Sequence, residues 1–281
     1  GFLKNPAAPL KWRAGFLFFA AVRGKHKDEP FRCLSFLDSK SSGLDDVAFE
    51  GRHGKSITIT ENIPKIYYEP EGYYYGARLI NMVLGYNTKF ITGDDIPDSW
   101  KDILDPRFKG KVGCSTPERS GAFFVTAGAF ANNPELGWDY FEELNEQNPV
   151  LDSNTGVANK IASGELLMGF VLDYKIRTMK EAGSPIDFVW PEEGAVSIPS
   201  PIGIISETDN LESAKQFVDY SISQSGQEEF ARNGFIPIRK DVSPPAGTPD
   251  LDEIKLMETD WEWLRDNYSD IIQKFNEIMI D

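Results

Sequence analysis

The stretch PERSGAFFVTAGAF places a hydroxyl and a glycine directly before an apolar run with helical spacing. Ser120 is a good N-cap residue, so the pattern predicts a helix that starts at Gly121. The first turn of a helix presents unpaired N–H donors and partial positive charge, and a glycine lets an anion approach that backbone. Thr116 and Arg119 would add donors from the preceding loop, and Ala122 would add a backbone N–H. The stretch therefore predicts an anion site, with a capped core helix as the alternative.

A second stretch, LDSNTGVANKIASGE, has the same order of residue types. Asn154, Thr155 and Gly156 stand before a helix that we expect to begin near Val157. Two such helix N-termini after strands would form a cradle at the carboxyl ends of those strands, where open α/β sheets bind ligands. With both stretches considered, the sequence supports an anion-binding site and two ordinary helix caps equally well.

The apolar run LLMGFVL predicts a buried strand, and Asp173 and Tyr174 follow its carboxyl end. An acid and a phenol at this place would bind ligand hydroxyls, an ammonium group or a metal ion, or would act in catalysis. The alternative is structural: Asp173 caps a helix that begins at Lys175, and Tyr174 packs against a neighbour. The sequence contains no Walker, GxGxxG, GxSxG or HExxH motif, so the usual catalytic signatures are missing.

The charge balance narrows the classes of partner. The chain has 281 residues with 44 acidic and 29 basic side chains, a formal net charge of −15. This balance argues against nucleic acid or an anionic membrane surface as a partner. No run approaches the ~20 apolar residues of a membrane span. We interpret the run AGFLFFAAV as a buried strand rather than part of a signal peptide, and an export signal removed before Gly1 is compatible with the sequence.

Histidine and cysteine are scarce. The two cysteines are Cys33 and Cys114, and the two histidines are His26 and His53. They make neither a disulfide framework nor a zinc cluster, and a soft metal site or a Cys–His nucleophile pair is not expected. We predict two small buried thiols, with a single bridge as the alternative.

Strand and helix patterns alternate along the chain, which predicts an α/β fold with largely parallel sheets. We expect the helices within residues 210–235 to turn Phe217, Val218 and Phe230 toward a core. The expected strands are 56–60, 79–91, 111–115 and 166–173, with two β segments within 185–207. The expected helices are 120–132, 134–147, one from about 157 and one at 175–182, two within 210–235, and helical spacing in the last thirty residues.

Five segments carry a resemblance to a known family. They are PDSWKDILDPRFKGKV, TPERSGAFFV, ASGELLMGFVLDYK, VWPEEGAVSIPSPIGIIS and NLESAKQFVDYSISQSGQEEFARNGFIPIRKDV, in this order. The sequence resembles the solute-binding proteins of ABC importers, in the group that contains ferric-iron binders and their relatives for phosphonates and sugar phosphates. The resemblance covers about Tyr73 to Val242, and its motifs are more specific for the group than for the ligand.

The resemblance implies a two-lobed periplasmic-binding-protein fold of type II, with two interlobe crossovers and a ligand cleft between the lobes. Lobe 1 would comprise residues 1–86 and 200–245, and lobe 2 residues 87–199 and 246–281. The Ser-Gly helix tip would then hold an anionic part of the ligand, or the anion that accompanies a metal. The resemblance also implies a monomer outside the cytoplasm, free or anchored by a segment absent from this sequence. Its partner would be an ABC permease, and it would have no catalytic residues and no cofactor.

Two departures from the family pattern bear on the ligand. The ferric-iron binders carry two adjacent tyrosines where this chain has Asp173 and Tyr174, so Tyr174 would be a metal ligand only if Fe³⁺ is the cargo. Residues 1–50 lack the family's opening pattern, so the sequence assigns no lobe 1 ligand contact. We expect a small anionic or zwitterionic solute of the phosphonate or sugar-phosphate type. Ferric iron is the alternative, and a transferase-like enzyme that uses Arg119, Asp173 and Tyr174 is the lower alternative.

Overall fold

A long strand, β4 (Tyr74–Asn87), runs through the middle of a mixed sheet. The computed structural model describes residues 19–22, 31–35, 48–49, 62–64, 67, 74–204, 211–250 and 253–280. The six-stranded sheet has the order β6-β5-β7-β4-β8, and β9 also pairs with β4. Its other strands are β5 (Val112–Cys114), β6 (Val150–Leu151), β7 (Met168–Leu172), β8 (Ile186–Val189) and β9 (Val196–Gly203). A separate antiparallel sheet contains β1 (Phe19–Val22), β2 (Phe31–Ser35) and β3 (Ala48–Phe49).

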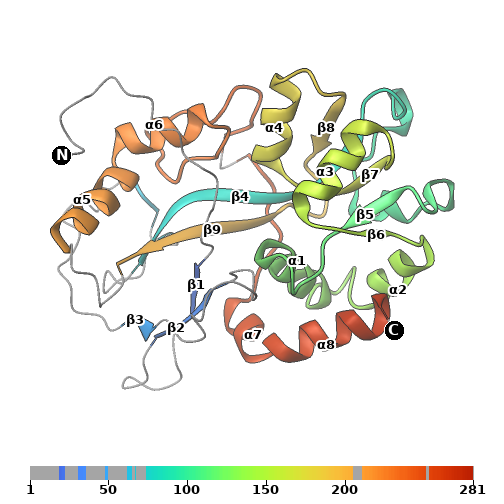
Figure 1. Cartoon of the computed structure of the whole chain (residues 1–281), viewed down its shortest axis with the longest axis horizontal. Coiled ribbons are helices and arrows are strands. Elements are labelled where there is room, and N and C mark those ends of the chain that lie inside the picture. Colours follow the sequence, from blue (N-terminus) through green and yellow to red (C-terminus); the bar gives the residue numbers. More distant parts are fainter. Residues whose placement is uncertain are drawn as a thin grey trace.

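The main sheet is parallel on one side of β7 only. β5 pairs in parallel with both β6 and β7, whereas β4 is antiparallel to β7, β8 and β9. The prediction of a largely parallel sheet was therefore wrong for the half around β4. β4 begins near α5 and α6, and its direction is opposite to that of the strands beside it (Figure 1).

Helices cover both faces of the sheet (Figure 1). They are α1 (Gly121–Ala131), α2 (Asp139–Glu146), α3 (Asn154–Ser163), α4 (Asp173–Glu181), α5 (Leu211–Ile222), α6 (Gln224–Arg232), α7 (Trp261–Asp266) and α8 (Tyr268–Met279). Short 3₁₀ turns lie at Gly93–Asp95, Trp100–Leu104 and Pro106–Phe108. Among the described residues, no helix combines the length and the apolar character that crossing a membrane requires.

Successive residues of the strands pack into two different hydrophobic cores, because side chains alternate between the two faces of a sheet. Leu84 and Phe170 belong to the core under α1, α2, α7 and α8, where Phe170 stacks on Trp100 at 5.0 Å between ring centroids. Val83 and Val171 belong to the opposite core, which packs against α3 and α4. This two-sided burial makes the sheet a rigid platform for the loops at its edge.

A third core lies at the other end of β4, against α5 and the segment after α6. Val218 and Ile222 of α5 pack there, whereas Phe217 is 47% exposed, so the prediction for Phe217 was wrong. The buried face of α5 follows the i, i+4 spacing of Val218 and Ile222, which turns Phe217 away. Phe230 of α6 is partly buried against the core that contains Phe170.

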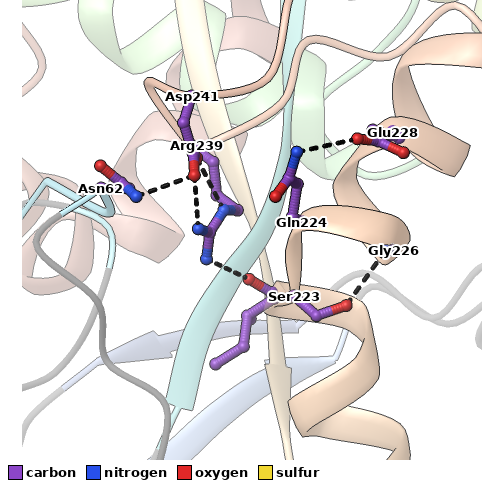
Figure 2. A network of polar contacts seen from close by, with 8 residues as sticks. Asn62, Ser223, Gln224, Gly226, Glu228, Arg239 and Asp241 are labelled. Carbon is purple, nitrogen blue, oxygen red and sulfur yellow. Dashed lines mark hydrogen bonds and ion pairs between the residues drawn. The ribbon is translucent and has the colours of Figure 1, made fainter.

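An ion pair lies at the C-terminal end of α5. Figure 2 shows Arg239 facing Asp241, and the guanidinium donates to both carboxylate oxygens at 2.9 and 2.8 Å. Arg239 also donates to the Ile222 carbonyl at 3.3 Å, and Asn62 donates to Asp241 at 2.8 Å. The network ties the segment after α6 to the C-terminal end of α5.

We expect this ion pair to support stability in a pH-dependent way. Hydrogen bonding from Arg239 holds the pKa of Asp241 below its ordinary value of 3.8. The pair's contribution is therefore fully present above that value and is lost as the pH falls through the lower pKa of the folded chain. Asp241→Asn should reduce the free energy of unfolding by at most about 1 kcal/mol at pH 7, because the carboxylate is partly exposed. Urea unfolding between pH 7 and pH 2 measures this, and a difference that stays constant over the range contradicts the prediction.

β4 and β9 lie side by side and span the molecule from α5 and α6 to α3 and α4 (Figure 1). This is the place that the resemblance gives to interlobe crossovers, and the proposed lobe boundaries stay predictions. Residues 56–60, His26 and His53 lie outside the described residues. Cys114 is a buried free thiol, so the alternative of a single bridge was wrong.

Candidate functional site

Three loops that carry the predicted residues leave the same edge of the sheet. β5, β6 and β7 are parallel, so their carboxyl ends at Cys114, Leu151 and Leu172 face one way. The loop after β5 leads to α1, the loop after β6 leads to α3, and β7 continues into α4. The sheet therefore presents the three predicted groups of residues at its carboxyl edge, as expected.

The first two groups touch. The Asn154 side-chain amide donates a hydrogen bond to the Ser120 hydroxyl oxygen at 2.7 Å. The same oxygen accepts the Phe123 N–H at 3.1 Å, so Ser120 is the N-cap of α1, as predicted. No acceptor for the N–H groups of Gly121 and Ala122 lies among the described residues. The tip of α1 thus offers two backbone donors beside a polar side-chain pair.

The turn before α1 is tight and mostly buried. The Thr116 carbonyl accepts the N–H groups of Arg119 and Ser120, both at 3.1 Å. Thr116 is 4% exposed, whereas the Arg119 side chain is exposed to solvent. The adjacent Ser115 hydroxyl is buried with no partner among the described residues. Arg119 therefore lies at the rim of this turn rather than in its interior.

The second helix tip begins earlier than the sequence suggested. α3 starts at Asn154, and Ser153 is its N-cap, accepting the Gly156 N–H at 3.0 Å. The expectation of a helix from near Val157 was wrong, because Ser153 already caps the backbone. The Gly156 N–H is thereby used inside the chain, and Thr155 is exposed. Of this group, Asn154 is the residue that faces α1.

Asp173 has internal partners for both carboxylate oxygens. One oxygen accepts the Asn81 N–H at 2.9 Å. The other accepts the Asn81 amide at 2.9 Å and Arg177 at 2.7 Å. Asp173 is completely buried, and α4 begins at this residue with Leu172 as its N-cap. The alternative in which Asp173 caps a helix from Lys175 was therefore wrong, and its contact with a ligand stays a prediction.

Tyr174 is half-buried on an aromatic neighbour. Its ring stacks on Phe235 with 4.4 Å between centroids. Burial raises the pKa of the phenol, and the Asp173 charge adds to this, while the nearby Arg78 charge opposes it. The neutral phenol, which can donate a hydrogen bond, is favoured over the phenolate.

Arg78 was not among the site residues predicted from the sequence. This residue lies on β4 at the irregularity between Gly76 and Arg78, and it is 6% exposed. Its guanidinium carbon is 4.1 Å from the centroid of the Phe235 ring. Burial lowers the pKa of Arg78 to about 10, while the Tyr174 side chain raises it. A single arginine within the apolar run YYYGARLINMVLG was the signal available in the sequence.

The described residues offer no cluster of metal-binding side chains, and the hollow beside α6 lies away from the carboxyl edge of the sheet. Within the described part of the chain, no group of three or more His, Cys, Asp or Glu side chains is placed to hold a metal ion. An open hollow of about 440 Å³ lies between α6 and the segment after Arg239, away from the predicted site residues. Its lining residues are Glu228, Ala231, Arg232 and 241–246.

A family model described as a bacterial extracellular solute-binding protein matches residues 54–267, about three-quarters of the chain. The chain belongs to this family. A Salmonella typhimurium protein, provisionally named as a 2-aminoethylphosphonate-binding periplasmic protein, is 25% identical over 215 residues. That match covers 69% of this chain and 61% of the relative. The chain spans about 60% of the length of the curated relatives it matches, 58% and 61% in two of them.

Solved structures of binding proteins share the fold. The periplasmic binding protein AfuA from Actinobacillus pleuropneumoniae, with fructose-6-phosphate bound, aligns with a TM-score of 0.71 and 24% identity. The alignment covers 82% of this chain and 76% of AfuA. The ferric binding protein of Campylobacter jejuni aligns with a TM-score of 0.67 and 18% identity, covering 82% and 77% of the two chains. The resemblance to solute-binding proteins and the periplasmic-binding-protein fold are both confirmed.

Proposed function

We propose that this solute-binding protein captures a small anionic or zwitterionic solute, of the phosphonate or sugar-phosphate type, and delivers it to an ABC permease. The observation that carries the proposal is the hydrogen bond from Asn154 to Ser120, which joins two helix N-termini at one edge of the sheet. The N–H groups of Gly121 and Ala122 lie beside this pair. Open backbone donors at the positive end of the α1 dipole suit an oxyanion.

The relatives support the same class of ligand. The name of the Salmonella typhimurium protein points to 2-aminoethylphosphonate, and AfuA was solved with fructose-6-phosphate. Both compounds carry a phosphorus oxyanion. The net charge of −15 does not oppose this, because local donors determine the potential inside a site.

Ferric iron is the second candidate, favoured by the phenol of Tyr174 at the carboxyl edge and by the fold shared with the Campylobacter jejuni ferric binding protein. Iron coordination by Tyr174 requires a phenolate, and burial raises the pKa of that phenol. The neighbouring Asp173 carboxylate is already held by Asn81 and Arg177. These two observations support an organic anion over iron.

We further propose binding without turnover. The enzyme alternative uses Asp173 as an acid or base, and its buried oxygens are held by donors from Asn81 and Arg177. The binding-protein relatives support the same view. A monomer in the periplasm or outside the cell, free or membrane-anchored and without a resident cofactor or nucleic-acid partner, completes the proposal.

Calorimetry and thermal unfolding of the purified chain test this function. The probes are 2-aminoethylphosphonate, fructose-6-phosphate, inorganic phosphate and ferric citrate, with metal analysis of the protein as purified. We expect a phosphoryl or phosphonyl probe to bind unchanged and to stabilise the fold by about 2.7 kcal/mol at 100 times its dissociation constant. Bound iron with a tyrosinate colour that disappears in Tyr174→Phe supports the iron alternative instead. Chemical conversion of a probe contradicts binding without turnover.

A further inference from the structure

A buried guanidinium lies where β4 passes the carboxyl edge of the sheet. Arg78 is 6% exposed, and transferring a charged group out of water is costly unless the surroundings compensate. The chain keeps this arginine in a strand whose neighbours Leu79 and Ile80 are core residues. The surroundings of Arg78 must therefore stabilise its charge.

Aromatic rings from another part of the chain hold the guanidinium. Its central carbon lies 4.1 Å from the Phe235 ring centroid and 5.5 Å from that of Phe230. Gln227 of α6 donates to the Ala77 carbonyl at 2.6 Å, which fixes α6 against β4 next to Arg78. Stacking of the planar group on a ring leaves its N–H donors directed outward in the guanidinium plane. Arg78 is therefore oriented by packing rather than by chain flexibility.

Tyr174 lies at the same carboxyl edge of the sheet as the two helix tips. Its ring stacks on Phe235, the ring that also carries Arg78. Tyr174 follows β7, whose parallel neighbour β5 leads to Ser120. The buried Asp173 next to it binds Asn81 of β4, so the start of α4 is locked to the strand that bears Arg78.

We propose that Arg78 and Tyr174 form a second, cationic subsite that binds oxygens of the ligand's phosphoryl or phosphonyl group. Arg78 supplies charge-assisted donors, and the Tyr174 hydroxyl supplies a neutral one. The raised pKa of Tyr174 keeps that hydroxyl protonated, which suits this role. The proposal deepens the proposed function and rests on it. It assigns to β4 the charged contact that the neutral donors of Ser120, Gly121 and Asn154 lack.

The experiment compares Arg78→Met, Arg78→Lys and Tyr174→Phe with the wild-type chain. Affinities for inorganic phosphate, 2-aminoethylphosphonate and fructose-6-phosphate are measured by calorimetry at low and high salt. We expect Arg78→Met to weaken binding roughly 10- to 100-fold, because it removes a charged hydrogen-bonding partner. Arg78→Lys should bind at an intermediate level, since it keeps the charge and loses the planar fork. Tyr174→Phe should weaken binding several-fold and leave the salt dependence unchanged, whereas Arg78→Met should reduce that dependence.

Arg107→Met is the matched control, since Arg107 is exposed and pairs with Asp95 and Asp105. It removes the same charge and should bind every probe as the wild type does. If Arg78→Met fails to fold, Arg78→Lys and Tyr174→Phe decide. Wild-type affinity in both overturns the subsite and leaves the proposed function standing. A wild-type chain that binds none of the phosphorus probes overturns both. Inorganic phosphate that binds as tightly as the organic probes shows that the phosphoryl group alone is recognised, and weaker phosphate binding shows that the organic part contributes.

Discussion

Replacing Asp173 with asparagine should lower the free energy of unfolding by about 3 to 5 kcal/mol. Asp173 is completely buried, and its partner Arg177 is 7% exposed. The pair is joined at 2.7 Å within α4. Removing the negative charge leaves the guanidinium of Arg177 buried without its counter-charge, which costs far more than the loss of a surface pair. The asparagine also replaces an acceptor of the Asn81 donors with a group that itself donates.

Urea unfolding of the purified chain measures this effect, and Asp187→Asn is its matched control. Asp187 pairs with Lys180 of the same helix at 2.6 Å, and the Lys180 side chain is 58% exposed. We expect this exposed pair to contribute about 1 kcal/mol or less. The double variant Asp173→Asn with Arg177→Met should recover part of the loss, because no buried charge remains. Equal effects of the two aspartate substitutions would falsify the structural role of Asp173.

The result also separates two roles for Asp173. A residue that holds α4 against β4 should affect ligand affinity only as far as it moves Tyr174 and Arg78. A direct ligand contact should remove affinity even where the variant is fully folded. Calorimetry well below the melting temperature of the variant therefore distinguishes a positioning residue from a binding residue.

Local patterns in the sequence were enough to predict several elements. The residue pattern over 134–147 predicted a helix there, and α2 covers Asp139–Glu146 of that range. Ser120 predicted the start of α1 because an N-cap depends only on a side chain and the N–H three residues later. Such features are decided within one turn of helix. The sequence alone is therefore sufficient to predict these local features.

Other features depend on contacts between distant parts of the chain. Asp173 and Asn81 are 92 residues apart, and their hydrogen bonds exist only once β4 lies antiparallel to β7. Arg78 receives its aromatic partner Phe235 only when the segment after α6 folds back on β4. Within SNT, Ser153 and Asn154 are both good caps, and only the backbone conformation selects Ser153. Propensity and spacing do not fix these choices.

The second large effect concerns the polar pair at the two helix tips. Asn154→Asp should weaken binding of the phosphoryl or phosphonyl ligand by at least about 100-fold, which corresponds to about 2.7 kcal/mol. The new carboxylate lies at the position where Asn154 now contacts Ser120 at 2.7 Å, beside the N–H groups of Gly121 and Ala122. It would occupy those donors and repel a second anion at short range.

The folded chain should tolerate the substitution, which makes the test specific for binding. A carboxylate in the first turn of α3 interacts favourably with the helix dipole, and the Ser120 hydroxyl can donate to it. We therefore expect the free energy of unfolding to stay within about 1 kcal/mol of the wild-type value. Asn145→Asp on the exposed face of α2 changes the net charge equally and should leave affinity unchanged. If Asn154→Asp binds the ligand as tightly as this control does, the anion is held elsewhere and the two helix tips are ordinary caps.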